Sequence, residues 1–384
     1  MQFALSEDQV AIQETARRFA AERLAPGYGA RDRTGVLDRT LMAEMGGIGL
    51  IAPEMPEAHG GLGASRVTSG VVIEAIAAGD FNMAYVQLLG SLCGQILAEH
   101  AAPAITAEWL PRVCAGERLI ALALTEPRGG SDAGNLALKM RREGDHYVLD
   151  GEKTSISCAD CADGAVVFAR TGTPEDGAGG VSAIFVPLTL PGIARTRFDD
   201  IGERAIGRGS IFFENVRVPA ENLLGAEGMG FRQVMQGFDF SRALIGLQCL
   251  AVARISLEET WAHVAERKAF GQSLSAFQGV SHRLAELDTQ VTAAHLLCYQ
   301  ALWAKDENLP HSAEAAMCKW WAPRLAFDTV HACLLFHGHA GYSRELPYEQ
   351  RLRDVLGLQI GDGTAEIMKT IIARQRVGRR AVPY

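Results

Sequence analysis

The spacing of hydrophobic positions along the chain changes twice, and each change predicts a domain boundary. Up to about residue 118, apolar residues recur at the helical spacing of i, i+3 and i+4. Between 119 and 228 they fall in short runs separated by turns, which is typical of a small β-sandwich or barrel. From 229 to 384 long helical periodicity returns. The pattern predicts a multidomain α+β protein with an N-terminal all-α domain (1–118), a middle β domain (119–228) and a C-terminal four-helix bundle (229–384).

The ends of the individual elements follow from proline and glycine. Pro26 is expected to end the first helix, and the proline- and glycine-rich segment 48–63 is expected to be a loop. The predicted helices span 6–24, 37–46, 64–79, 82–100, 107–115, 231–266, 277–305, 313–337 and 365–377. The predicted strands span 119–124, 146–149, 165–169, 182–186 and 211–213.

Composition narrows the function classes. With 384 residues and a net charge of −8, the chain lacks the basic surface expected of a nucleic-acid-binding protein. No uninterrupted apolar run reaches membrane-spanning length, and the first residues do not resemble a signal or transit peptide. The eight cysteines are scattered, as expected of free thiols in the cytoplasm. Cys158 and Cys161 form a single CxxC, and His337 and His339 form an HxH. Both lack partners at ligand spacing, so we expect no metal site.

One carboxylate near the end of the helical half stands out. Asp362 lies between Gly361 and Gly363, directly before an apolar-periodic helix for which Thr364 is a candidate N-cap. Flanking glycines allow a sharp turn and a close approach of the backbone to a ligand. Such a carboxylate suits a general base, but Asp is equally at home in a purely structural turn. The local sequence leaves both interpretations open.

Further motifs favour a bound heterocycle. The segment 122–132, which reads LALTEPRGGSD, ends a β run in a glycine-rich turn whose hydroxyls and backbone N–H groups suit a flat polar ring. No GxGxxG follows an opening strand, which excludes a standard dinucleotide-binding fold. GxSxG, HExxH and GxxxxGK[ST] are also absent, so the hydrolase, zinc-protease and P-loop classes are not supported.

In order and wording, four motifs resemble the acyl-CoA dehydrogenase family of flavoproteins. They are TEPxxGSD (125–132), ERxxFG (266–271), GHAGY (338–342) and RD followed by DGT (353–354 and 362–364). The resemblance covers essentially the whole chain. Within the family, the wordings GEKTSIS, GFDFSR, AAMCKWWAP and GLQIGDGTAEI look most like cyclohexanecarboxyl-CoA dehydrogenases.

The resemblance implies bound FAD between the β domain and the C-terminal bundle, an acyl-CoA substrate, an electron-transfer flavoprotein as acceptor, and a homo-oligomer, usually a tetramer. Asp362 matches the base. The positions matching cofactor contacts are Leu124, Thr125, Gly130, Ser131, Ser155, Ser157, Arg267, Phe270, Gln278, Gly338, Thr364 and Glu366, of which Arg267, Phe270 and Gln278 would reach the FAD of a neighbouring subunit. The positions matching substrate contacts are Ser131, Phe238, Asp239, Ser241, Arg242, Gly361 and Gly363, with Arg242 near the CoA moiety.

Several positions depart from the family pattern. Many members carry tryptophan and threonine where this chain has Ser155 and Ser157, so one flavin face should be more open. The usual base is a glutamate after tyrosine, whereas here Asp362 follows Gly361. Some members place a glutamate base where this chain has Ser241, which leaves Asp362 as the one carboxylate at a base position matched by the family.

These departures favour desaturation of a branched or cyclic acyl-CoA, such as cyclohexanecarboxyl-CoA to cyclohex-1-ene-1-carboxyl-CoA. The shorter aspartate and the missing aromatic ring together leave room beside the α carbon. Phe81–Ala98 carries no carboxylate, which argues against the related 1,4-dehydrogenation of cyclohexenecarboxyl-CoA. An oxygen-reactive enzyme of the same fold (like nitroalkane oxidase or acyl-CoA oxidase) and a flavin-free, non-enzymatic family member stay open as alternatives. The sequence does not fix the acyl group, its stereochemistry, the electron acceptor or the choice between tetramer and dimer.

Overall fold

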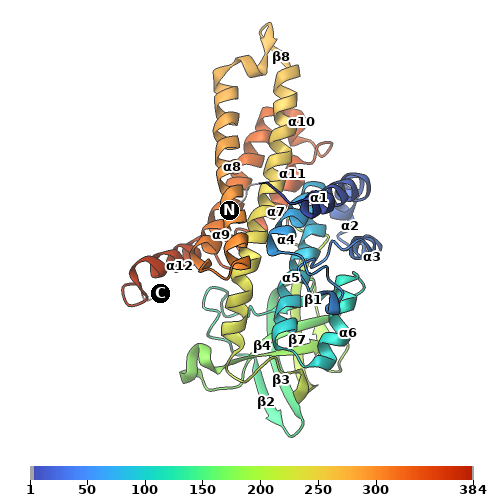
Figure 1. Ribbon diagram of the computed structural model, residues 1–384, viewed down its shortest axis with the longest axis vertical. Helices are drawn as coiled ribbons and strands as arrows, with labels where there is room; N and C mark the ends of the chain where they lie inside the picture. The colour runs from blue at the N-terminus through green and yellow to red at the C-terminus, as the bar shows by residue number, and fades with distance from the viewer. Residues whose placement is uncertain (1–3, 383–384) are drawn as a thin grey trace.

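A computed structural model describes residues 4–382, and it has the predicted three-domain architecture (Figure 1). The chain forms an N-terminal helical domain, a middle β half-barrel and a C-terminal helical domain in that order. Of the proposed domain ranges, the terminal residues 1–3 and 383–384 lie outside the described residues. The exact division at 118 and 228 stays a proposal.

The N-terminal domain is built from capped amphipathic helices around one largely buried helix. Ser6 and Gln9 form a capping box at the start of the first helix, and Asp80 caps the buried α5 through the backbone N–H groups of Asn82 and Met83. The helices of this domain are α1 (Glu7–Phe19), α2 (Tyr28–Thr34), α3 (Arg39–Gly47), α4 (Arg66–Gly79), α5 (Phe81–His100) and α6 (Pro103–Cys114).

The predicted stop at Pro26 is wrong. The chain continues from α1 through a π-helical turn, Ala20–Leu24, and a 3₁₀ turn, Ala25–Gly27, into α2. Pro26 stands in the first positions of that 3₁₀ turn, where the missing N–H and the fixed φ are tolerated.

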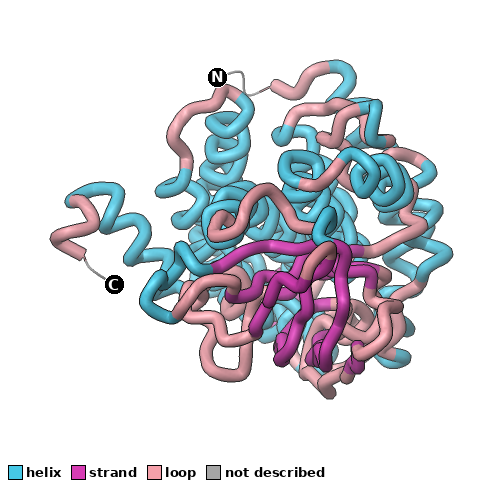
Figure 2. The backbone as a smooth tube through the Cα atoms, turned by 90° about the horizontal axis from the view of Figure 1, so that it is seen from below, coloured by secondary structure: helices cyan, strands magenta, loops and turns pink. Residues whose placement is uncertain are grey.

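Seven strands of the middle domain form one curved sheet with the order β1-β4-β2-β3-β7-β6, and β5 pairs with β4 (Figure 2). The two long strands, β3 and β7, pair antiparallel, and their register shifts between Lys153 and Ile156. The strands are β1 (Ile120–Ala123), β2 (Lys139–Glu143), β3 (His146–Ser157), β4 (Gly164–Arg170), β5 (Val181–Pro187), β6 (Ile193–Arg195) and β7 (Arg208–Pro219).

The C-terminal domain packs around α7, whose 37 residues make it the longest described helix. By length and composition α7 is apolar enough to cross a membrane, but 89% of its most apolar window is buried inside the protein. It therefore serves as the central helix of the bundle. The helices are α7 (Gly230–Glu266), α8 (Gln278–Asp306), α9 (Ser312–Phe336), α10 (His339–Tyr342), α11 (Tyr348–Gly357) and α12 (Ala365–Val377), and a small hairpin of β8 (Lys268–Ala269) and β9 (Gln272–Ser273) joins α7 to α8.

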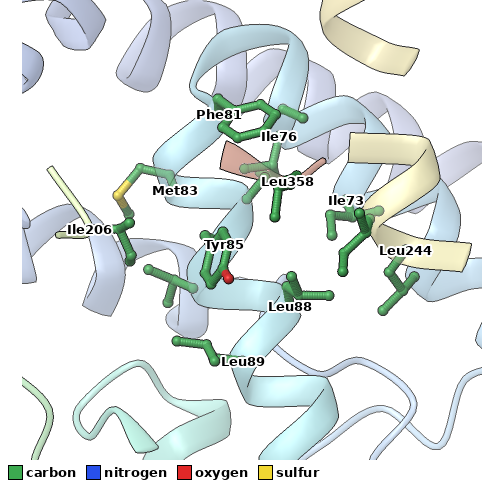
Figure 3. Packing of buried hydrophobic residues seen from close by; sticks show 14 of the residues in the cluster. Ile73, Ile76, Phe81, Met83, Tyr85, Leu88, Leu89, Ile206, Leu244 and Leu358 are labelled. Carbon is green, nitrogen blue, oxygen red and sulfur yellow. The ribbon is translucent and has the colours of Figure 1, made fainter. Parts of the chain in front are cut away.

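The three domains meet in one apolar core around α5 (Figure 3). Tyr85 and Leu88 of α5 lie in this cluster with Leu244 of α7, Ile206 of the middle domain and Leu358 after α11. Because side chains from all three domains are buried together, the relative placement of the domains is fixed by packing.

Candidate active site

Asp362 lies in a tight loop between α11 and α12 that has left-handed backbone angles. Its φ is 53° and that of Gly363 is 105°. Aspartate tolerates this region better than most non-glycine residues. Glycine suits position 363 for two reasons: it adopts positive φ angles without strain, and a β carbon there would overlap the Cε atom of Met368. A β carbon on Gly361 would meet no atom within 4 Å, so space lies open beside it. The expected sharp turn and the expected room at Gly361 are both present.

The Asp362 carboxylate is surrounded by polar groups from other elements. Its Oδ2 atom accepts a 3.3 Å hydrogen bond from the Ser241 hydroxyl, and its backbone carbonyl accepts one of 3.4 Å from Arg242 Nε. Burial raises the pKa of Asp362 above its usual value, whereas the charges of Lys319 and Arg242 oppose that rise. A carboxyl group with a raised pKa is suited to general base chemistry at neutral pH.

Lys319 of α9 is a site residue that the sequence reasoning missed. It is 1% exposed, and its ammonium donates a 3.1 Å hydrogen bond to the carbonyl of Gly363. The available signal was a single lysine inside the apolar helical segment 315–323, since a lone charge in such a run is buried only when it has a partner.

The α5 helix supplies a second group that sequence reasoning missed, Tyr85. The hydroxyls of Tyr85 and Ser157 are hydrogen bonded at 3.2 Å. Burial, and to a smaller extent the negative charge of Asp362, raises the pKa of Tyr85 to about 12, so the two side chains lie within electrostatic range of each other. Tyr85 of α5 thus contacts Ser157 at the end of β3 and senses the charge of Asp362 after α11.

The loop after β1 is fastened to β3 by a buried ion pair. Lys153 Nζ lies 2.8 Å from Glu126 Oε1 and donates a 2.9 Å hydrogen bond to the carbonyl of Leu124. The backbone N–H of Thr154 donates to the carbonyl of Thr125 at 2.9 Å. This fastening sets Leu124 and Thr125 beside the strand that carries Ser155.

The same edge fits the flat heterocycle expected from the motifs. Ser155 is exposed and has a φ of 56°, at the point where the register between β3 and β7 shifts. A bulge of this kind re-aims a side chain out of the sheet. Gly130 and Ser131 lie exposed in the loop after β1. The edge therefore offers exposed hydroxyls and backbone, which suits a flat polar ring.

The predicted substrate residues on α7 are mostly buried. Phe238, Ser241 and Arg242 are buried, and Arg242 donates a 3.1 Å hydrogen bond to Asp239. Asp239 also accepts a 2.5 Å hydrogen bond from Ser312. Arg242 thus lies under the Asp362 loop, and its role toward CoA stays a prediction.

Other predicted cofactor residues lie far from Asp362 along the bundle. Arg267 caps the end of α7 directly before the β8–β9 hairpin, and Phe270 lies between its two strands, at the end of the molecule opposite the sheet (Figure 1). Gln278 begins α8. Phe270 is 97% exposed. Within one chain these residues do not meet the Asp362 loop, which is the placement needed if they contact a neighbouring subunit.

The remaining predicted residues flank α10 and α12. Gly338 precedes α10 with a φ of 60°. Thr364 occupies the N-cap position of α12, although its side chain makes no capping hydrogen bond. Glu366 is exposed and lies 3.6 Å from Lys369.

A cationic hollow of about 700 Å³ lies beside the loop after β1. Its lining includes Arg128, Lys139, Arg142, Arg170 and Glu227, so positive charge predominates. Arg128 and Lys139 are both exposed. A hollow of this size and charge suits a phosphorylated group.

Metal-ligating side chains do not gather among residues 4–382: no group of three or more His, Cys, Asp or Glu residues could hold an ion there. In the HxH pair, His337 is half-buried. Its ring stacks on that of His263 with 4.2 Å between the ring centres, and it shares a hydrogen bond with the Tyr348 hydroxyl. Both contacts belong to packing of the bundle.

Comparison with known proteins gives matches along almost the whole chain. Residues 6–117, 121–216 and 228–376 match the models of the acyl-CoA dehydrogenase N-terminal, middle and C-terminal domains. The probable acyl-CoA dehydrogenase YngJ of Bacillus subtilis is 34% identical, over 98% of this chain and 99% of that protein. Butyryl-CoA dehydrogenase from Megasphaera elsdenii has a TM-score of 0.94 at 30% identity, covering 98% of this chain and 100% of its own. A structure described as the electron transferring flavoprotein of Acidaminococcus fermentans has a TM-score of 0.95 at 31% identity, covering 98% and 100%.

Proposed function

Because the chain belongs to the acyl-CoA dehydrogenase family and is an FAD-dependent oxidoreductase, we propose that it desaturates an acyl-CoA thioester between its α and β carbons. Asp362 is the proposed base. The observation that carries this proposal is the Asp362 loop itself. It joins a half-buried carboxylate of raised pKa to Ser241, Arg242 and Lys319, and its charge acts on Tyr85 of α5.

Residues of this chain would remove the α-proton and stabilise the negative charge that its removal leaves. That proton is too weakly acidic for a free carboxylate at neutral pH, so the charge that develops on the thioester oxygen needs donors aimed at it. The backbone N–H of Asp362 is one such donor in the proposed pose, and its carboxylate takes the proton. When bound, FAD supplies the acceptor for the hydride that leaves the β carbon. Leu124, Thr125, Ser155 and Ser157 are proposed to hold its ring.

We further propose that the acyl group is branched or cyclic, with cyclohexanecarboxyl-CoA as the leading substrate. Asp362 is one methylene shorter than glutamate, and a misplacement of about 1 Å can cost about 10²-fold in rate, so the α carbon must lie closer. The open space beside Gly361 accepts a ring at that position. The relatives named above include a butyryl-CoA dehydrogenase and none named for a cyclic substrate, so this finer assignment rests on Gly361 and Asp362.

The cationic hollow beside the loop after β1 is proposed to receive the phosphates at the nucleotide end of CoA. Arg128 and Lys139 are exposed there, whereas Arg170 is bound to backbone carbonyls, including that of Leu136 at 2.6 Å. Exposed cations gather phosphate by long-range attraction and hold it by charge-assisted hydrogen bonds.

The protein is proposed to act in the cytoplasm as a homotetramer that passes electrons to an electron-transfer flavoprotein. The exposed Phe270 on the β8–β9 hairpin, with Arg267 and Gln278 beside it, supports contact with a neighbouring subunit. The similarity to the structure described as an electron transferring flavoprotein supports the choice of acceptor.

An oxygen-reactive enzyme of the same fold is the second candidate, because Ser155 is exposed on the proposed flavin edge. A small side chain there leaves a path for oxygen. Turnover with oxygen as the sole acceptor would favour this candidate. Turnover that requires an added electron acceptor would favour the dehydrogenase.

The experiment that tests the main proposal is anaerobic bleaching of the flavin by a panel of acyl-CoAs. Cyclohexanecarboxyl-CoA is compared with butyryl-CoA and a branched acyl-CoA at equal concentrations. We expect the cyclic substrate to bleach the flavin fastest. Bleaching by butyryl-CoA alone would leave the dehydrogenase assignment standing and overturn the cyclic substrate, and a purified protein without flavin absorbance would overturn both.

A further inference from the structure

Two consecutive carbonyls of the Asp362 loop are each bound by a buried cation. Arg242 Nε of α7 donates to the carbonyl of Asp362 at 3.4 Å, and Lys319 Nζ of α9 donates to the carbonyl of Gly363 at 3.1 Å. The two cations come from different helices. Neither donor lies on the open side next to Gly361.

The loop needs such support. With a φ of 53°, Asp362 holds a backbone angle that a non-glycine residue seldom adopts, whereas Gly363 tolerates its φ of 105°. A non-glycine residue in this region persists only when the surrounding structure holds it there. Hydrogen bonds to the two carbonyls fix the two peptide planes that follow Asp362, and they therefore restrict the backbone from which its carboxylate projects.

From this geometry we propose that Lys319 is a positioning residue for Asp362, which binds the carbonyl of Gly363 and sets a positive charge beside the carboxylate without touching the substrate. The proposal rests on the function proposed above, in which Asp362 takes the α-proton. It adds a residue from α9, 43 positions earlier in the chain than the base (362 − 319).

The charges that face Asp362 come from every element packed around it. Lys319, Arg242 and Arg208 are positive and lower its pKa, whereas burial raises it. On α5, the hydroxyl of Tyr85 and the thiol of Cys93 lie within range of its charge, and burial together with that charge raises the pKa of both groups. Among these positive charges, Lys319 has the largest effect on the pKa of Asp362. Burial lowers the pKa of Lys319 itself to about 8, while Asp362 acts to raise it, so Lys319 is charged at neutral pH.

Loss of the charge on Lys319 should therefore move the ionisation of Asp362 to higher pH. An opposite charge close to a carboxylate lowers its pKa by about one to three. At low pH, flavin reduction should slow as Asp362 takes up a proton, and this part of the pH–rate profile is its acid limb. In Lys319→Met we expect the acid limb to move upward by about one pH unit or more. At a fixed pH below that limb, the rate should be about tenfold lower for every pH unit by which the limb has moved. Lys319→Arg keeps the charge and should keep the limb within a few tenths of a pH unit.

The test measures the rate of anaerobic flavin reduction against pH in the wild type and in Lys319→Met, Lys319→Gln and Lys319→Arg. A second readout without substrate is an infrared titration of the Asp362 carboxyl band, identified by its loss in Asp362→Asn. The matched control is Lys369→Met on α12, which removes the same charge from a side chain that is 54% exposed. If Lys319→Met does not fold, Lys319→Gln decides, because it keeps a hydrogen-bond donor but not the charge.

The inference is supported if the acid limb and the carboxyl titration both move to higher pH in Lys319→Met and Lys319→Gln. Neither should move in Lys369→Met or Lys319→Arg. If the acid limb and the carboxyl titration of the Lys319 variants stay where they are in the wild type, and only yield or stability falls, the inference is overturned. Lys319 would then have a purely structural role. If Asp362→Asn itself keeps full flavin reduction, the proposed base fails and the role of Lys319 fails with it. If Asp362→Asn is inactive and the Lys319 variants titrate as the wild type, only the role of Lys319 fails.

Discussion

Tyr28 donates a 2.6 Å hydrogen bond to Asp354, although 326 positions separate the two residues in the chain. The same carboxylate accepts from the Asn82 amide at 3.2 Å and from the backbone N–H of Glu203 at 2.5 Å. Asp354 thereby ties the N-terminal helices, the loop before β7 and the C-terminal bundle together at one buried point. Arg353 beside it binds Asp32 at 2.9 Å.

The Asp354 junction predicts a pH-dependent stability. Burial raises the pKa of Asp354 to about 8, from about 4 in an unfolded chain. Between these values the folded protein keeps a proton that the unfolded chain has lost, so the free energy of unfolding should fall as pH rises, by at most about 1.4 kcal/mol per pH unit. Asp354→Asn should remove this dependence. Urea unfolding at pH 6, 7, 8 and 9 measures it, and equal slopes in both proteins would contradict the prediction.

Replacing the base should separate cofactor binding from catalysis. Asp362→Asn keeps the shape of the loop and its carbonyls, so the protein should purify with its yellow flavin. Anaerobic reduction by acyl-CoA should slow by about 10²- to 10⁴-fold, which is the usual contribution of a general base. Ser241→Ala, which removes one hydrogen bond to the carboxylate, should slow it far less. Unchanged reduction in Asp362→Asn would exclude Asp362 as the base.

Filling the space beside Gly361 should change substrate choice. In Gly361→Tyr the ring would occupy the volume proposed for a cyclic acyl group. We expect kcat/KM for cyclohexanecarboxyl-CoA to fall at least about tenfold relative to butyryl-CoA, in line with the few kcal/mol that a steric mismatch costs. Gly361→Ala is the smaller control. Parallel losses for both substrates would indicate general damage to the loop instead.

The buried Lys153–Glu126 pair should be needed for the flavin edge. Lys153→Met leaves Glu126 charged and without its cation, which typically costs about 3–5 kcal/mol of stability. The loop after β1 should loosen, and the protein should lose FAD on dilution. Lys139→Met, on an exposed position of β2, should change stability by less than about 0.5 kcal/mol. Denaturant unfolding and flavin content after gel filtration measure the two effects.

The cationic hollow should contribute to substrate affinity in a salt-dependent way. The double variant Arg128→Ala/Lys139→Ala should raise KM for acyl-CoA several-fold with kcat nearly unchanged, and the difference should shrink at high salt. An acyl-pantetheine thioester, which has no nucleotide, should be used equally by both proteins. A KM change that is independent of salt, or equal for both substrates, would place the nucleotide elsewhere.

Prediction from sequence succeeded where local pattern and motif carry the information. The helical periodicity of 64–79 and 231–266 gave α4 and α7 within a few residues, because apolar faces recur at helical spacing. It failed at β2, whose residues Lys139–Glu143 are mostly charged and exposed and are a strand only because they pair with β3. It also missed α11, whose buried Arg351 pairs with the distant Glu259 and whose buried Asp354 accepts hydrogen bonds from Tyr28 and Asn82.

The sequence by itself determined the family, the three-domain order and Asp362 as the candidate base, because these depend on motif wording and short-range spacing. Only the tertiary structure decided what surrounds that base. Lys319 and Tyr85 come from different helices and were not among the residues predicted from the sequence, and the hydrogen bond between Tyr85 and the predicted Ser157 appears only in the fold. The effect of Lys319 on the pKa of Asp362 depends on burial and distance, which arise only when α7 and α9 pack against the Asp362 loop.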